Sequence, residues 1–275
     1  MEPYWNLIEE IVKESDIVLN ILDARLVEES RNKKIEEIIK EKKRPVIYVL
    51  NKADLISRKD LEWKIDDLKR ETGKEIVYVS NRQRRTIKTL LAKIRQMFAE
   101  YGKRPGFVPE IKKPYREAKG DIVVGVVGYP NVGKSSIINS LSFKKKVKVS
   151  KKAGTTHGIH WVKAGDEIKL IDTPGVIPLE KPDEARLGMI AARSPDRIKE
   201  PDLVAAKIIS MFLNEKKLEK LGYFYSVKIP EEMNAYEILE FIAKEKKHLK
   251  KGGVADEIRT AMMIVKDWQD GRLKL

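Results

Sequence analysis

The residues best suited to chemistry form a short run at 128–135, Gly-Tyr-Pro-Asn-Val-Gly-Lys-Ser. This run matches the phosphate-binding pattern G-x-x-x-x-G-K-[ST], with an apolar stretch before it and helical spacing after it. Its glycines let backbone N–H groups converge on a β-phosphate at the start of a helix. We expect Lys134 to neutralise β- and γ-phosphate oxygens and Ser135 to ligate Mg²⁺. The candidate nucleotide contacts in this run and just after it are Asn131, Val132, Gly133, Lys134, Ser135 and Ser136.

A second motif, Asp172-Thr173-Pro174-Gly175, follows another apolar run. Asp172 at a strand end is placed to hold Mg²⁺ through water, and the Gly175 N–H to bond a γ-phosphate. Taken alone, this tetrapeptide is equally compatible with a simple turn. Between the two motifs, Ala153-Gly154-Thr155-Thr156 supplies a Thr that can ligate Mg²⁺ and sense the γ-phosphate, a role we assign to Thr156. The candidate metal ligands are Ser135, Thr156 and Asp172, and the candidate catalytic residues are Lys134, Thr156 and Gly175.

A third motif, Asn51-Lys52-Ala53-Asp54, has the residue types that read guanine. Asp54 can accept hydrogen bonds from N1–H and from the exocyclic amine. Adenine lacks both donors there, so a buried carboxylate would stay unpaired at a cost of about 1–3 kcal/mol or more. We expect Asn51 to tie this loop to the phosphate loop, Lys52 to cover the base with its stem, and Ser80 to lie where a backbone N–H contacts guanine O6.

The order of the motifs is unusual for a guanine-nucleotide protein. The guanine-reading motif and Ser80 precede the phosphate loop, although they ordinarily follow it. Each motif still comes directly after its own apolar run, so the same site can assemble from a circularly permuted chain. Residues 102–120, rich in Pro and Gly, then read as the linker that joins the former ends of the chain.

Apolar patterning predicts an α/β fold. Short apolar runs predict strands at 16–24, 46–50, 75–80, 121–128, 158–163 and 167–171. Helical spacing predicts helices at 4–14, 30–43, 58–72, 86–101, 133–142, 201–222, 234–248 and 254–270. Strands that alternate with helices imply a doubly wound, mostly parallel sheet, followed after Pro178 by a small helical domain.

Composition excludes several classes of protein. The 275 residues include no Cys and three His, which rules out disulfide frameworks, iron–sulfur clusters, thiol nucleophiles and zinc fingers. No apolar run is long enough for a transmembrane helix and the first residues do not resemble a signal peptide, so we expect a cytoplasmic protein with no membrane partner. The net charge of +14 is concentrated at 76–99, 101–120 and 141–165, which favours a nucleic-acid partner over a membrane surface.

With these motifs in this order, the chain resembles the circularly permuted GTPases of the YlqF (RbgA) type, which assist large ribosomal subunit assembly. The resemblance covers nearly the whole chain and extends to Gly-Gly-Val-Ala-Asp-Glu-Ile-Arg at 252–259, which is similar to that type's C-terminal G-G-x-x-D-x-x-R signature. It implies a Ras-like GTPase domain, here 1–178, followed by a helical RNA-binding domain, here 179–275. It also implies binding to ribosomal RNA or to pre-ribosomal particles.

The sequence departs from the family at residues that bear on hydrolysis. Val176 follows Gly175, at the place where Ras-type enzymes have a Gln that orients water. A valine cannot hydrogen-bond water, so we expect slow intrinsic turnover. RNA, a bound K⁺ or rearranged switches are alternative sources of the missing group, and Asn131 resembles the Asn that coordinates K⁺ in related GTPases. The first residues, MEPYWNLIEE, do not match the His-containing segment with which bacterial members begin.

These observations predict a GTP-binding and GTP-hydrolysing switch that uses Mg²⁺, cycles between GTP and GDP, and acts as a monomer. Its partners are expected to be ribosomal RNA and the large ribosomal subunit or its precursor. The alternative is an RNA-binding assembly factor in which GTP occupancy is only a signal and hydrolysis is incidental.

Overall fold

A computed structural model describes residues 2–80, 82–105, 122–142, 160–164, 167–172, 184–191 and 193–275. Contacts between residues divide the chain into two compact units. The first, which we call the sheet unit, comprises Met1–Asp54 and Arg58–Pro178. The second, the helical unit, comprises Leu55–Ser57 and Leu179–Leu275. Each unit is described by itself.

The sheet unit is built on six strands in the order β3-β2-β1-β4-β6-β5. Neighbouring strands are parallel, except that β5 runs antiparallel to β6. The strands are β1 Ile17–Asp23, β2 Val46–Asn51, β3 Glu75–Tyr78, β4 Ile122–Val127, β5 His160–Ala164 and β6 Ile168–Asp172. Every residue of β1, β2 and β4 is buried, as expected for central strands covered on both faces. The expected mostly parallel α/β fold is thus confirmed.

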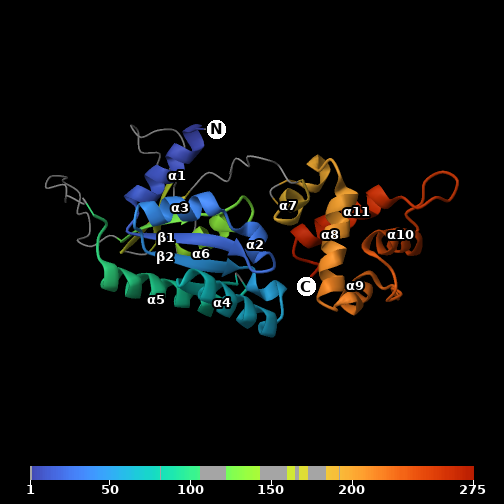
Figure 1. Cartoon of the computed structure of the whole chain (residues 1–275), viewed down its shortest axis with the longest axis horizontal. Helices are drawn as coiled ribbons and strands as arrows, with labels where there is room; N and C mark the ends of the chain where they lie inside the picture. Colours follow the sequence, from blue (N-terminus) through green and yellow to red (C-terminus); the bar gives the residue numbers. More distant parts are fainter. Residues whose placement is uncertain are drawn as a thin grey trace. The chain divides into compact units, whose positions relative to one another are not determined.

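Helices cover both faces of this sheet. They are α1 Glu2–Glu14, α2 Val27–Ser30, α3 Lys33–Glu41, α4 Arg58–Thr72, α5 Arg84–Tyr101 and α6 Lys134–Leu141, with a 3₁₀ turn η1 at Ala53–Leu55. Figure 1 shows α1 and α3 on one side of the sheet and α5 on the other. The chain builds outward from β1 through β2 to β3 and then returns to place β4 on the other side of β1. This reversal makes the carboxyl ends of β1 and β4 the switch point of the sheet, which is where doubly wound sheets bind ligands.

The helical unit contains α7 Glu184–Met189, η2 Pro195–Arg197, α8 Pro201–Asn214, α9 Leu218–Tyr225, α10 Ala235–Glu245 and α11 Glu257–Gln269. The single helix expected at 201–222 was wrong, because two helices, α8 and α9, occupy this range. The chain leaves the helix at Lys216, which adopts a left-handed φ of 54°. Trp268 of α11 is fully buried, packs edge-on against Phe212 and donates its indole N–H to the Met189 carbonyl at 2.9 Å.

The glycine pair of the C-terminal signature forms the tip of a small hairpin between α10 and α11. Leu249 and Ala255 make an antiparallel bridge, and the Lys250 N–H donates to the Val254 carbonyl at 2.8 Å. Gly252 and Gly253 have φ values of 90° and 80°, so both occupy conformations that favour glycine. Lys250 and Lys251, which directly precede these glycines, are exposed. None of the helices in the described ranges is long and apolar enough to cross a membrane.

Candidate functional site

The phosphate-binding pattern lies at the carboxyl end of β4, the strand that pairs with β1. Strand β4 ends at Val127, the loop follows, and α6 begins at Lys134. Gly128 has a φ of 143°, and a Cβ there would lie 2.5 Å from the Ile21 carbonyl oxygen. Gly133 has a φ of 99°, and its Cβ would lie 2.0 Å from Asn51 Nδ2. The loop thus needs glycine at both positions, and it presents the first N–H groups of α6 to an anion.

Lys134 lies inside this loop rather than in solvent. Its ammonium donates to the carbonyls of Gly128 and Tyr129, both at 2.8 Å, and only 5% of the residue is exposed. The ammonium therefore crosslinks the loop backbone and places a positive charge beside the expected position of the phosphates. Val132 is buried, whereas Asn131, Ser135 and Ser136 are exposed.

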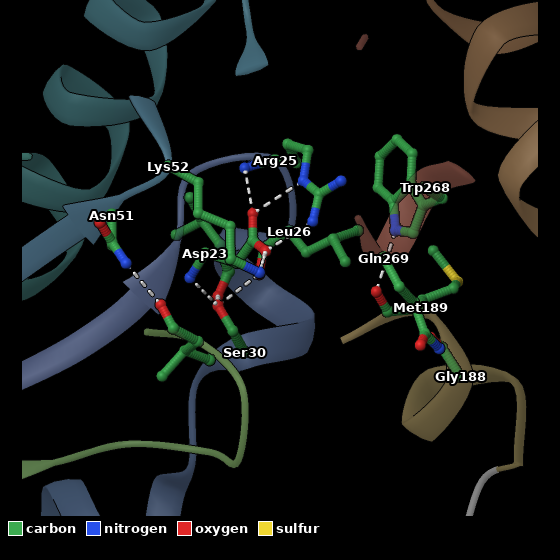
Figure 2. A network of polar contacts seen from close by, with 12 residues as sticks. Asp23, Arg25, Leu26, Ser30, Asn51, Lys52, Gly188, Met189, Trp268 and Gln269 are labelled. Atoms are coloured by element: carbon green, nitrogen blue, oxygen red, sulfur yellow. Dashed lines mark hydrogen bonds and ion pairs between the residues drawn. The ribbon is translucent and has the colours of Figure 1, made fainter. Parts of the chain in front are cut away.

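The guanine-reading motif reaches the phosphate loop through Asn51, the last residue of β2. Asn51 Nδ2 donates to the Val132 carbonyl at 2.7 Å, which is the tie that the sequence predicted (Figure 2). Asn51 is 1% exposed and its Oδ1 is buried with no hydrogen-bond partner. A buried amide oxygen without a donor is uncommon in folded proteins, which marks Asn51 as an unusual position at this edge of the sheet.

Asp54 lies in the turn η1, directly after β2, and meets Ser80 after β3. The Ser80 hydroxyl donates to Asp54 Oδ1 at 2.8 Å, and Arg82 Nε lies 3.2 Å from Asp54 Oδ2. The Ser80 N–H, the type of donor expected to contact guanine O6, donates instead to Thr86 Oγ1 at 3.1 Å. Ser80 therefore contacts the carboxylate that is expected to read the base through its hydroxyl rather than through its N–H.

The expected magnesium ligands are only partly described. Asp172 ends β6, and its backbone pairs with Val126 of β4, two residues before the phosphate loop. Ser135 lies in the first turn of α6. A hydroxyl and a carboxylate are oxygen donors of the kind that Mg²⁺ prefers, so these two residue types suit the ion. Thr156, Gly175 and Val176 lie outside the described residues, as does most of the expected linker 102–120.

Three residues at this edge of the sheet were missed by sequence reasoning. Asp23 ends β1, Arg25 lies two residues after it, and the two form a fully buried ion pair at 2.9 Å. Arg82 pairs with Asp54. The sequence did carry a signal for Asp23 and Arg25, because two opposite charges stand two residues apart at the end of an apolar run. Arg82 is one of several basic residues at 76–99, so its residue type alone did not predict the contact with Asp54.

Fold and site together define a class of protein. A glycine-rich phosphate loop follows β4, and a loop with the groups needed to read guanine follows β2, at the same edge of a doubly wound sheet. In sequence, the base-reading loop comes first. This is the arrangement of a P-loop GTPase whose chain is circularly permuted.

Comparison with known proteins agrees with this class. A family described as 50S ribosome-binding GTPase matches residues 123–247. Ribosome biogenesis GTPase A of Priestia megaterium is 30% identical over 94% of this chain and 86% of its own length. A GTP-binding protein of Methanocaldococcus jannaschii is 40% identical over 98% of this chain. The chain belongs to the YlqF/RbgA-type family of circularly permuted GTPases.

A solved structure has a similar fold over nearly the whole chain. The GDP-bound structure of YlqF matches with a TM-score of 0.62 and 22% identity, covering 98% of this chain and 96% of that one. Lengths differ among the curated relatives. The chain spans 66% of the Methanocaldococcus jannaschii protein and as little as 43% of other relatives.

Proposed function

We propose that this chain is a GTP-hydrolysing switch that binds ribosomal RNA or pre-ribosomal particles and assists assembly of the large ribosomal subunit. The observation that carries the proposal is the joining of two recognition loops at one sheet edge. Asn51 Nδ2 on the Val132 carbonyl links the base-reading loop to the phosphate loop. The names of the relatives, ribosome biogenesis GTPase A among them, support the ribosomal role.

In this proposal the nucleotide lies across the carboxyl ends of β1 and β4. Asp54, oriented by the Ser80 hydroxyl, accepts the two donors of guanine. The N–H groups at the start of α6 and the ammonium of Lys134 hold the phosphates. Ser135, Thr156 and Asp172 are the proposed Mg²⁺ ligands, and Gly175 the proposed γ-phosphate contact.

Hydrolysis is expected to be slow without a partner. Val176 gives no side chain that orients water, so the ribosomal particle or a K⁺ ion near Asn131 supplies the missing group in this proposal. Replacing K⁺ by Na⁺ should slow hydrolysis, and Asn131→Ala should remove the difference. Equal rates in the two ions would exclude the K⁺ role and leave the particle as the activator.

Two basic regions are the proposed RNA contacts. The sequence 141–165 is rich in lysine and includes the expected switch residue Thr156. The segment 244–251 precedes the hairpin tip, where Lys247, Lys250 and Lys251 are exposed. Phosphate contacts from these lysines release counterions, so binding should weaken steeply with salt.

The experiment measures binding to large-subunit precursor particles with a non-hydrolysable GTP analogue and with GDP, across a range of salt. We expect tighter binding with the analogue. The double substitution of Lys250 and Lys251 by Gln should lower the salt slope by about 1.4 to 1.8 in all, at 0.7–0.9 per contact. Replacing Lys59 and Lys69, which are exposed on α4, removes the same charge and should leave the slope unchanged.

Multiple-turnover hydrolysis with and without particles completes the test. Stimulation by particles supports a switch driven by hydrolysis. Nucleotide-dependent binding without stimulation supports instead an assembly factor that uses GTP occupancy as a signal. Equal binding with the analogue and with GDP would contradict the proposal that the nucleotide switches particle binding.

A further inference from the structure

The end of β1 contacts the base-reading loop through one buried carboxylate. Asp23 pairs in register with Asn51, and the Ala24 N–H donates to the Asn51 carbonyl at 2.8 Å. Lys52 follows with a left-handed φ of 60°. Its ammonium donates to Asp23 Oδ2 at 2.8 Å, as Figure 2 shows. The lysine of the base-reading loop is thus held by a residue from outside the nucleotide-binding motifs.

The Asp23 carboxylate is fully buried and bonded on both oxygens. The side chains of Asp23 and Arg25 are both 0% exposed. Oδ1 accepts the Arg25 backbone N–H at 3.0 Å and Nε at 3.1 Å, and Oδ2 accepts Nη2 at 2.9 Å. Burial alone would raise the pKa of Asp23, but the guanidinium of Arg25 and the ammonium of Lys52 outweigh it and hold that pKa well below its usual range. Asp23 therefore stays ionised in the folded protein.

The need to neutralise a buried charge explains Arg25 but not Lys52. Arg25 already gives Asp23 a bidentate partner, which meets the requirement for pairing buried charges. The Lys52 side chain is 19% exposed, so it could extend into water. Instead it bends back on a backbone conformation that non-glycine residues rarely adopt. Such strain is kept where a functional group must be held in place.

We propose that Asp23 is a positioning residue for guanine recognition, holding the Lys52 ammonium so that the lysine stem lies ready across the face of the base. The inference rests on the proposed placement of guanine on residues 51–54. Without the anchor, the flexible stem must be ordered when nucleotide binds, and that ordering weakens binding. The expected loss is about tenfold in GDP affinity, which is about 1.4 kcal/mol, and it should lie mainly in faster release.

The test replaces the buried pair as a unit. Asp23→Leu combined with Arg25→Met removes both charges, so neither is left unpaired in the interior. Lys52 then has no anchor, and a fluorescent GDP analogue should bind about tenfold more weakly. Arg25→Met alone is the matched control, because the contact between Asp23 and Lys52 remains. It should lower the melting temperature and change GDP affinity by no more than about twofold.

A second background separates positioning from general damage. If Asp23 acts through Lys52, the paired substitution should cause no further loss of affinity in a Lys52→Met protein. An additive loss there, or an equal loss in Arg25→Met alone, would overturn the proposal. Should the paired variant not fold, Asp23→Asn keeps the shape and removes the charge, and it should release GDP faster in the same Lys52-dependent way.

Measuring the GDP affinity of Asp54→Asn separates a failure of the role of Asp23 from a failure of the proposed guanine site. If Asp54→Asn binds GDP normally, the base is not read by this loop and the proposed site itself fails. If Asp54→Asn loses affinity but the Asp23 variants do not, only the positioning role of Asp23 fails.

Discussion

The two ends of the proposed nucleotide site are built in different ways. The base-reading end is a set of side chains held by other side chains, with Ser80 on Asp54 and Asp23 on Lys52. The phosphate end is a backbone shape. It depends on left-handed glycines at 128 and 133 and on carbonyls that Lys134 gathers inward. Asn51 belongs to the base-reading end and donates a hydrogen bond to the Val132 carbonyl of the phosphate end.

This difference follows from what each end recognises. A phosphate is symmetric and highly charged, so convergent N–H groups and one ammonium suffice. A purine must be told from its close analogue by the direction of its donors, which requires a carboxylate held in one orientation. Substitutions at the phosphate end should therefore affect all nucleotides alike, whereas those at the base-reading end should change selectivity.

The largest effect is expected from Gly133→Ala. The added Cβ would lie 2.0 Å from Asn51 Nδ2 on a backbone with a φ of 99°, so the loop and the base-reading end must move apart. We expect at least a hundredfold loss of affinity for GDP and GTP, measured by isothermal titration calorimetry. Gly73→Ala is the control, since its φ of 62° is also left-handed but nothing lies within 4 Å. That variant should lose about 1 kcal/mol of stability and bind normally.

Asp54→Asn should break the base-reading end alone. The amide cannot accept both guanine donors, and two unsatisfied hydrogen bonds at about 1–3 kcal/mol each predict a loss of about a hundredfold for GDP. The new N–H₂ can donate to the 2-oxo group of xanthine, so XDP should bind better than to the unmodified protein. Competition of GDP, XDP and ADP against a fluorescent nucleotide measures all three. Equal weakening for every base would place the fault in folding rather than in recognition.

The sequence allowed the phosphate end to be predicted more fully than the base-reading end. Glycine spacing encodes a backbone shape directly, and the apolar runs before Gly128 and Asn51 correctly placed both loops on parallel strands. The contact between Asp23 and Lys52 depends on strand register and on a left-handed backbone at a lysine, and neither is legible from residue types. The same limit hid the break at Lys216, because helical propensity there is uninterrupted.

The link between the two ends can be tested by combining substitutions. Asn51→Ala leaves the Val132 carbonyl without its donor and should weaken GDP binding about tenfold. It also removes the atom that a Cβ at Gly133 would strike. Adding Gly133→Ala to Asn51→Ala should therefore cost clearly less than Gly133→Ala costs in the unmodified protein. A fully additive double variant would show that the two ends act independently.

The smallest effect, and the one of opposite sign, is expected from Arg82→Ala. The guanidinium lies 3.2 Å from Asp54 Oδ2, one of the two oxygens that guanine needs, so the base must displace it. The Arg82 side chain is 67% exposed, and such a pair contributes at most about 1 kcal/mol. Removing it should tighten GDP binding by about two- to fivefold and make association less dependent on salt. Arg84→Ala removes the same charge two residues further along and should leave affinity unchanged. Weaker GDP binding in Arg82→Ala alone would mean that this arginine contacts the nucleotide instead of competing with it.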